Sequence, residues 1–443
     1  MQIIEIMILL VTTICWGMQI WASHRQRFVK NIEHVLIAAL LAMLLLHFLM
    51  EGYRWMSIPI YILLLLVIAN YLFRNKNRQL TRLRSVLFSI LIVFATALAW
   101  AASAILPVFH FEKPSGQYAV GVIDYTWTDS SRTLNNGDAR KLNVRIWYPA
   151  ASPSKLPVSY IPSPDAFIGA LEQQYGAWLK LLKDYRLVHI PASYAPSFSV
   201  QASPAPVVVY LHGNHLGTGF TGTFQALELA SHGYIVMAVE HPGTAFISAF
   251  SEKEYVLFHN EFQDLAESFS AHNAAAIPII NEQQADVEFT LHYLLNIKEY
   301  EPDSPLSQQM DSNRIAIMGH SFGGATAANM LVHSPIIKAA INLDGYLYGE
   351  YPATPKNKPL LIINGGLQLE ELEETMTDLE VERKLREQLL AAGGIELELP
   401  EAGHLSFTDL PLYSPLLMPL APNIKEQHRL INQHTLQFLH KHL

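Results

Sequence analysis

Four long apolar runs, separated by short polar segments, occupy the first 110 residues of the chain. A helix needs about 20 residues to cross the hydrocarbon core of a bilayer, with a range of roughly 17–25. Three of the runs reach that length, and the second reaches it when its flanks are counted. Such runs in succession, with almost no internal charge, are typical of membrane-spanning helices rather than of buried helices in a soluble domain. We therefore expect a transmembrane region over residues 1–110, with about four helices near Ile3–Trp21, Val35–Met50, Met56–Phe73 and Val86–Phe109.

Beyond residue 110, short apolar runs of four or five residues alternate with segments of helical periodicity. Two or three β-rich segments, including Tyr118–Thr128 and Leu142–Tyr148, are expected before this alternation. Alternating strands and helices predict a mostly parallel sheet covered by helices on both faces. The continuous apolar character of the later runs is typical of parallel strands. We expect one α/β domain over residues 111–443, with strands at Val207–Leu211, Ile235–Val239, Ile315–Met318, Ala339–Leu343 and Leu360–Ile363.

The remaining segments of this region have helical or aromatic patterns. Charged and apolar residues alternate over Glu370–Leu390, which predicts an amphipathic surface helix ended by the Gly-Gly pair at 393–394. A similar helix is expected over Ile424–Leu443, closing the sheet. Two insertions, Pro153–Pro204 and Gly243–Ile280, are rich in aromatic residues. Their composition fits an acyl or lipid pocket or a lid, and ordinary packing of cap helices explains it equally well.

The hexapeptide Gly-His-Ser-Phe-Gly-Gly at residues 319–324 is the most informative motif in the chain. It follows a short strand pattern and precedes a helical segment. A G-x-S-x-G turn between a strand and a helix is the nucleophile elbow of an α/β-hydrolase, which exposes a serine hydroxyl above the sheet. Small residues are needed at Gly319 and Gly323, because a β-carbon there would collide with the neighbouring helix or strand. The motif predicts an α/β-hydrolase fold with Ser321 as the nucleophile.

A serine nucleophile needs a histidine base, a carboxylate that orients the histidine, and donors for the oxyanion. In this fold these residues follow the chain order Ser, then Asp or Glu, then His. We expect His404 to be the base, because a Gly-His pair in the loop after the last strand, Ile395–Leu399, is where the fold places it. The other histidines after Ser321 lie on helical patterns and are expected on solvated helix faces: His333, His428, His434, His440 and His442.

Two places in the chain are candidates for the acid. Asp344 ends an apolar strand and stands beside a glycine. Most α/β-hydrolases carry the acid after the next strand, which nominates Glu370 or Glu371, but these belong to a run of charges typical of a solvated helix face. That next strand ends in Asn364, which cannot serve as the acid. We favour Asp344, whose alternative role is that of a turn or helix-capping aspartate.

The oxyanion hole is expected to use two backbone N–H groups. One comes from the residue after the nucleophile, Phe322, and the other from the loop after an earlier strand. The run Val207–Leu211 leads into His-Gly-Asn-His-Leu-Gly, so Asn214 or His215 would supply the second N–H. His212 and His215 have no carboxylate or cysteine partner, which makes a metal site a weak hypothesis. We expect neither a metal nor a cofactor.

Together these motifs resemble the plasma-type (group VII phospholipase A2) branch of the platelet-activating factor acetylhydrolases, which are α/β-hydrolases. In that family the acid follows the strand after the elbow, so the resemblance implies that Asp344 is the acid, and it places Asn214 at the oxyanion position. The loop here is longer than the family's usual His-Gly-Leu-Gly. The resemblance implies phospholipids with short or oxidised sn-2 acyl groups as substrates, and bacterial relatives include general esterases and polyester hydrolases. The similar pieces cover most of residues 115–410: Gly116–Gly121, Arg145–Pro149, Val209–Gly213, Leu229–Val236, Val239–His241, Gly319–Gly324, Leu343–Asp344 and the His404 loop.

Positive charge is concentrated in the first and third loops between the apolar runs, whereas the second loop holds only Glu51 and Arg54. Loops rich in Lys and Arg face the cytoplasm. Both termini and the catalytic domain are therefore expected outside, which for a bacterial inner or cell membrane means the periplasm or the exterior. The first run carries Glu5 and lacks a basic leading region, so it is not expected to be a signal peptide. The loop charges are Arg25, Arg27 and Lys30, then Arg74, Lys76, Arg78, Arg82 and Arg84.

Composition narrows the range of partners. The first 110 residues hold nine of the 30 basic and three of the 39 acidic residues, so residues 111–443 carry a net charge of −15. Such a domain repels phosphates, which argues against a nucleic-acid role and against tight electrostatic docking on anionic lipid. The single cysteine, Cys15, allows no intramolecular disulfide. The sequence gives no indication of the oligomeric state.

The main hypothesis is a membrane-anchored serine ester hydrolase that acts on a small ester or lipid. The alternative is a membrane sensor, transport or assembly module whose hydrolase-like domain binds a ligand. The complete Ser-Asp-His set favours the first hypothesis, and the membrane runs hold few of the ionisable groups that transport requires. Ester hydrolysis by the isolated fragment 111–443 would discriminate between the two.

Overall fold

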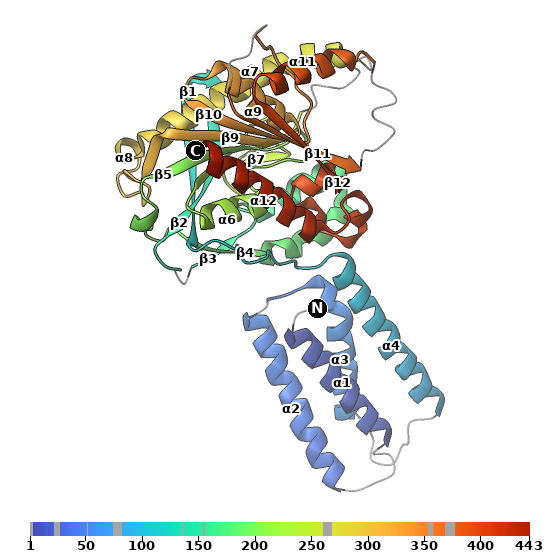
Figure 1. The fold of residues 1–443 in the computed structure, drawn as a ribbon. Helices are drawn as coiled ribbons and strands as arrows, with labels where there is room; N and C mark the ends of the chain where they lie inside the picture. The colour runs from blue at the N-terminus through green and yellow to red at the C-terminus, as the bar shows by residue number, and fades with distance from the viewer. Residues whose placement is uncertain are drawn as a thin grey trace. The chain divides into compact units, whose positions relative to one another are not determined.

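The computed structural model describes residues 3–21, 27–50, 52–73, 82–134, 137–153, 156–259, 268–352, 358–367 and 377–443. The chain divides into two compact units (Figure 1). One consists of Met1–Val108 with Ser414–Leu416, and the other of Phe109–Tyr413 with Leu417–Leu443.

The first unit is helical, as its apolar runs predict. Its elements are α1 (Ile3–Trp21), α2 (Arg27–Met50), the short helix η1 (Trp55–Ser57), α3 (Ile58–Phe73) and α4 (Arg82–Ile105). The fourth run was expected to continue to Phe109, which is wrong for its last four residues. Pro107 explains the early end, because a proline disfavours helical backbone in the residue before it.

Three helical segments of this unit are long and apolar enough to cross a membrane: Asn31–Met50, Trp55–Phe73 and Val86–Ile105. The apolar part of α1 is shorter, at Ile3–Gln19. Several polar side chains inside the unit are paired with one another. Arg54 Nη1 lies 3.0 Å from Glu5 Oε2, with both side chains 1% exposed. Pairing of this kind lowers the cost of burying charge among apolar helices.

The second unit is built on a ten-stranded sheet with the order β12-β11-β10-β9-β5-β6-β2-β1-β4-β3. All neighbours from β12 to β6 are parallel, and β2 joins β6 in the antiparallel sense. This mostly parallel sheet confirms the predicted α/β fold. The strands are β1 (Ala119–Thr133), β2 (Ala139–Ala150), β3 (Pro157–Ser159), β4 (His189–Tyr194), β5 (Ala205–Leu211), β6 (Ile235–Val239), β9 (Met310–His320), β10 (Ile337–Leu343), β11 (Leu360–Leu367) and β12 (Gly394–Gly403).

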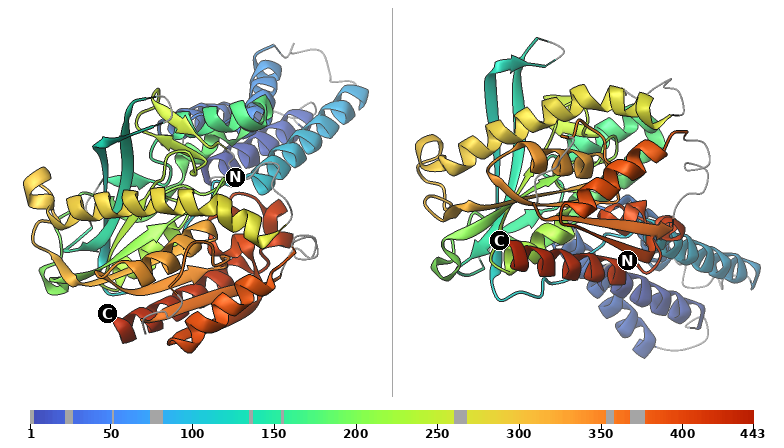
Figure 2. Two further views of the ribbon diagram at one scale, coloured as in Figure 1. Left: turned by 90° about the horizontal axis from the view of Figure 1, so that it is seen from above. Right: turned by 45° about the horizontal axis from the view of Figure 1, so that its top comes forward.

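Helices cover both faces of this sheet (Figure 2). On one face lie α7 (Phe269–Leu295), α9 (Phe322–His333) and α11 (Glu380–Ala391), and on the other lie α6 (Thr223–Ser231) and α12 (Ile424–His442). All five residues of β6 are buried, as expected for a parallel strand between two helical layers.

The two insertions contribute smaller elements. The first holds β3, α5 (Pro164–Tyr175), the short helix η2 (Ala177–Leu187) and β4, and the second holds the hairpin of β7 (Ile247–Ala249) and β8 (Tyr255–Leu257) before α7 begins. The amphipathic helix expected over Glu370–Leu390 is shorter, because residues 377–379 are not helical and α11 begins at Glu380. Residues 368–376 of that prediction lie outside the described part of the chain. Gly393 ends the segment at a φ of 103°, as expected of a glycine stop.

Candidate active site

Ser321 occupies the sharp turn between β9 and α9. Its backbone has φ 54° and ψ −120°, a conformation that residues with a β-carbon rarely adopt. The Ser321 N–H donates to the Leu343 carbonyl at 2.8 Å, and the Ser321 carbonyl accepts from the Gly324 N–H at 2.9 Å. These bonds tie the strained turn to the end of β10 and to the first turn of α9.

The glycines of the motif are required by contact with the backbone. A β-carbon at Gly323 would lie 2.5 Å from the Leu211 carbonyl oxygen and 2.6 Å from that of His212. A β-carbon at Gly319 would collide with the carbonyl group of Gly323. The prediction that these two positions need small residues is confirmed.

Asp344 and His404 are brought together from the ends of β10 and β12. Asp344 Oδ2 lies 2.6 Å from His404 Nδ1, and Asp344 Oδ1 accepts from the Gly365 N–H at 2.7 Å. Burial alone would raise the pKa of the Asp344 carboxyl, but the hydrogen bond and charge of His404 and the Gly365 N–H outweigh burial and lower this pKa. The carboxylate is therefore ionised at neutral pH, in a position to hold one tautomer of His404.

The His404 side chain is half-exposed at the start of the short helix η4 (His404–Phe407). Buried His320, which precedes Ser321, donates from Nε2 to the His404 carbonyl at 3.0 Å, and the two rings lie 4.5 Å apart. Burial and then the neighbouring His404 lower the pKa of His320 to about 3, so this imidazole is neutral. His320 thus holds the loop that carries the predicted base.

The loop after β5 lies against Ser321. A β-carbon at Gly213 would lie 3.3 Å from Ser321 Cβ. The His215 N–H already donates to the Thr244 carbonyl at 3.0 Å, whereas the Asn214 N–H has no acceptor among the described residues. Of the two predicted second donors, the geometry therefore favours Asn214. The other predicted donor, Phe322, is the first residue of α9.

The alternatives considered for acid and base lie elsewhere. Asn364 donates to Glu396 Oε1 at 2.7 Å, while Glu370 and Glu371 lie outside the described residues. The expectation of a solvated face is wrong for His428, which is buried between α12 and α6. Its ring stacks on Phe224 with centroids 3.6 Å apart, and Nε2 donates to the Thr408 carbonyl at 3.0 Å.

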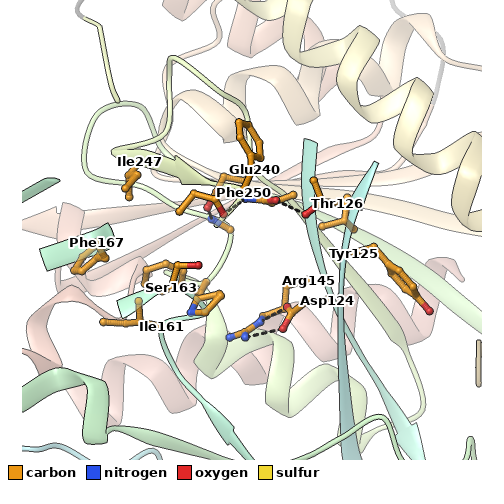
Figure 3. Close-up of a pocket in the computed structure, with 16 residues that line it drawn as sticks. Asp124, Tyr125, Thr126, Arg145, Ile161, Ser163, Phe167, Glu240, Ile247 and Phe250 are labelled. Atoms are coloured by element: carbon orange, nitrogen blue, oxygen red, sulfur yellow. Dashed lines mark hydrogen bonds and ion pairs between the residues drawn. The ribbon is translucent and has the colours of Figure 1, made fainter. Parts of the chain in front are cut away.

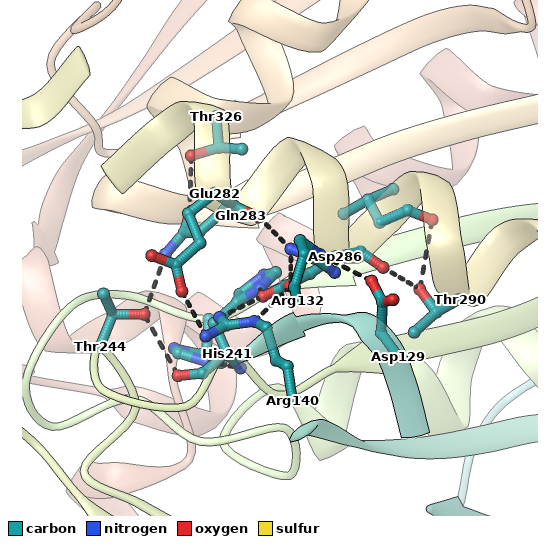
Figure 4. Close-up of polar contacts among 12 residues, drawn as sticks. Asp129, Arg132, Arg140, His241, Thr244, Glu282, Gln283, Asp286, Thr290 and Thr326 are labelled. Atoms are coloured by element: carbon teal, nitrogen blue, oxygen red, sulfur yellow. Dashed lines mark hydrogen bonds and ion pairs between the residues drawn. The ribbon is translucent and has the colours of Figure 1, made fainter. Parts of the chain in front are cut away.

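A buried polar network near the oxyanion loop was not predicted from the sequence (Figure 4). Asp286 of α7 binds Arg140 Nε and Nη2 at 2.7 Å each, and its Oδ2 lies 2.9 Å from His241 Nδ1. Burial would raise the pKa of Asp286, but the hydrogen bonds from Arg140 and His241 lower it to about 2. Because the partners are 146 and 45 residues from Asp286, no local pattern reveals the network. The sequence pointed to the network only through His241, in the Glu-His pair at residues 240–241.

Two cavities lie beside the loop that follows β6. One, of about 240 Å³, is surrounded by the Asp124–Arg145 ion pair, Glu240 and residues of the first insertion (Figure 3). Burial raises the pKa of Glu240 to about 7, although Asn143 and the Gly219 N–H donate to its carboxylate. The other, of about 370 Å³, lies between the loop after β6, the β7–β8 hairpin and α7.

The aromatic residues of the insertions divide between core packing and the walls of the two cavities. Tyr160 and Tyr185 are fully buried and pack as ordinary core residues. Phe167 and Phe250 line the smaller cavity, and Phe258 lines the larger one.

Comparison with known proteins shows that the chain is similar to proteins named as acetylhydrolases and esterases. The family model described as platelet-activating factor acetylhydrolase, isoform II, matches residues 105–443. Platelet-activating factor acetylhydrolase of Cavia porcellus is 28% identical over 275 residues, which are 57% of this chain and 59% of that protein. A probable 1-alkyl-2-acetylglycerophosphocholine esterase of Arthroderma benhamiae is 24% identical over 326 residues, 70% of this chain and 79% of the other. The chain spans about three fifths of the length of the mammalian relatives that it matches.

Among solved structures, a ferulic acid esterase from Streptomyces cinnamoneus has a similar fold. The TM-score is 0.59 with 24% sequence identity, and the match covers 76% of this chain and 93% of the esterase. This likeness shows the α/β-hydrolase fold that the nucleophile elbow predicted.

Proposed function

The chain belongs to the platelet-activating factor acetylhydrolase isoform II family, and from this premise we propose that it is a serine ester hydrolase. Ser321 is the nucleophile, His404 the base and Asp344 the acid. The observation that carries the proposal is the 2.6 Å contact between Asp344 and His404, formed by strand ends beside the strained Ser321 turn. An Asp–His pair beside a serine elbow is the arrangement that acyl transfer requires.

The geometry supports the following sequence of steps. Because Nδ1 of His404 faces the Asp344 carboxylate, Nε2 is left to accept the Ser321 proton as Oγ attacks the ester carbonyl. The N–H groups of Phe322 and Asn214 stabilise the oxyanion. His404 then gives its proton to the leaving alcohol, and water hydrolyses the acyl-enzyme with His404 as the base again. None of these steps needs a cofactor.

The proposed substrates are phospholipids with short or oxidised acyl groups, or related esters. The names of the relatives support this choice, because a 1-alkyl-2-acetylglycerophosphocholine carries a short acyl ester. Residues 1–110 would anchor the protein as an integral membrane region, and residues 111–443 would form the catalytic domain. Three apolar helices of membrane-spanning length support the anchor.

The test uses the detergent-solubilised full chain and its Ser321→Ala variant. Both are incubated with a fluorophosphonate probe, with 1-alkyl-2-acetylglycerophosphocholine, and with p-nitrophenyl esters of increasing chain length. We expect labelling and turnover in the wild type, a preference for short acyl groups, and a loss of at least about 10⁴-fold in kcat in the variant. A folded wild type that is neither labelled nor active would contradict the proposal.

A further inference from the structure

His212, at the start of the oxyanion loop, uses both of its ring nitrogens to hold the backbone. Nε2 lies 3.1 Å from the His241 backbone nitrogen, and Nδ1 lies 2.9 Å from the Gly213 carbonyl oxygen. Because a backbone N–H can only donate, Nε2 is the acceptor, and the proton is on Nδ1, which donates to Gly213. Burial and then the neighbouring His241 lower the pKa of His212 to about 3, so the ring is neutral at physiological pH.

The bond to Gly213 has a consequence for the next residue. The Gly213 carbonyl and the Asn214 N–H belong to one planar trans peptide unit, in which they point in opposite directions. Fixing the carbonyl therefore fixes the direction of the Asn214 N–H. We propose that His212 is a positioning residue, which directs the Asn214 N–H toward the oxyanion through this peptide unit. The inference rests on the proposed function, because it assigns a role in the same site.

The surroundings explain why such a bond is needed. Glycine populates left-handed and right-handed backbone conformations about equally, so a peptide unit next to Gly213 has no side chain to hold its orientation. Gly217 supports the arrangement, because a β-carbon there would collide with the Gly213 carbonyl. On the other side of the loop, Gly213 packs against the ring of His320 and the β-carbon of Ser321.

The buried network of Figure 4 fixes His241, the residue to which His212 is bonded. The His241 backbone N–H is the donor to His212, and the His241 ring is bonded to Asp286 at 2.9 Å. Asp286 is in turn fixed by the two hydrogen bonds from Arg140. The network thus makes His241 a rigid partner from which His212 positions the oxyanion loop.

The test compares His212→Phe with His212→Asn in the full chain. Phenylalanine keeps the ring shape and removes both hydrogen bonds, whereas an asparagine amide can still donate to Gly213 from near the position of Nδ1. We expect His212→Phe to lower kcat about 10²-fold to 10³-fold with KM within a few-fold, and His212→Asn to recover most of this loss. The affinity for a trifluoromethyl ketone, which mimics the oxyanion, should fall in parallel with kcat/KM, while a ground-state product analogue binds as before.

His428→Phe is the matched control, because His428 is also buried, neutral and bonded to a backbone carbonyl. It should lower the melting temperature as much as His212→Phe does and leave kcat within about threefold of the wild type. Wild-type kcat in His212→Phe, or equal losses of kcat in both phenylalanine variants, would overturn the inference. Failure of the proposed function is a separate result, because the wild type itself would then show no labelling of Ser321.

Discussion

At the scale of single residues, the contact between Asp344 and His404 leads to a specific prediction for the Asp344→Asn variant. In Asp344→Asn the amide would present an N–H to Nδ1 of His404, so the ring would keep its proton on Nε2 and could not accept one from Ser321. We expect kcat to fall about 10³-fold to 10⁴-fold with little change in melting temperature, because Oδ1 still accepts from Gly365. Steady-state kinetics and thermal unfolding of the full chain check this.

The control for this prediction is Asp311→Asn, which removes a partly exposed carboxylate paired with Arg314 at 2.7 Å. Its kcat should equal that of the wild type. If Asp344→Asn were as active as this control, the acid would have to come from another residue, such as Glu370 or Glu371.

The residues proposed for catalysis could be predicted because each has a local signal. Ser321 lies in a G-x-S-x-G turn, while Asp344 and His404 follow apolar strands beside a glycine. The topology explains why these three residues lie close together, because the carboxyl ends of parallel strands meet at one edge of the sheet. Asp286 has no such signal, since it is one acidic residue within a long helix. Its importance comes from Arg132, Arg140 and His241, which the fold brings to it from distant parts of the chain.

At the scale of elements, the elbow depends on close backbone packing between β5, β9 and α9. Gly323→Ala would place a methyl group 2.5 Å from the Leu211 carbonyl oxygen, and neither backbone segment can move without disturbing the sheet. We expect destabilisation of about 3 kcal/mol or more, measured as a large decrease in melting temperature. Gly169→Ala in α5 is the matched control, because nothing lies within 4 Å of the added methyl group, and it should stabilise by up to about 1 kcal/mol. Equal melting temperatures would contradict the packing argument.

The Asp286 network joins β1, through Arg132, to β2, the end of β6 and α7. Removing one member of a buried ion pair costs about 3–5 kcal/mol, so Asp286→Asn should clearly lower the melting temperature at pH 7. The folded pKa of about 2 lies below the ordinary value of 3.8, so the ionised carboxylate stabilises the fold above about pH 4. That contribution is lost as the pH falls from about 4 toward 2.

The difference in melting temperature between wild type and Asp286→Asn should therefore narrow as the pH falls through this window. Thermal unfolding of the full chain at pH 7, 5, 4 and 3 measures it. Asp311→Asn, which removes a partly exposed carboxylate, should differ little from the wild type in melting temperature at every pH. A gap between wild type and Asp286→Asn that stays constant down to pH 3 would show that the ionised carboxylate is not what stabilises these elements.

Element boundaries were predicted well where a segment is apolar throughout, and poorly where its ends are polar or charged. The run Ile235–Val239 coincides with β6, because the strand is buried on both faces and apolar throughout. In contrast, β9 begins at Met310, five residues before the predicted run, because Met310 pairs with Ala205 and a polar irregularity separates it from Ile315, where regular pairing with β5 resumes. The periodicity of charged residues predicted a helix that starts at Glu370, but α11 begins at Glu380.

At the scale of the whole molecule, the chain combines a unit of apolar helices with an acidic hydrolase-like unit. Within the helical unit, Arg54 and Glu5 form a buried ion pair. This pair also bears on topology, because Arg54 is the only basic residue of the second loop. Its charge is neutralised by Glu5 and buried, which sharpens the contrast with the basic first and third loops.

That contrast leads to a prediction about the side of the membrane on which catalysis occurs. Because loops rich in Lys and Arg remain in the cytoplasm, the second unit should face outside. Replacing the single cysteine, as in Cys15→Ser, allows one new cysteine to report its own position. In that background, Asp303→Cys on the surface of the second unit should react with a membrane-impermeant maleimide on intact cells. Asn77→Cys in the third loop should react only after permeabilisation. The opposite pattern would place the second unit and the substrate ester in the cytoplasm, and would contradict the orientation inferred from the loop charges.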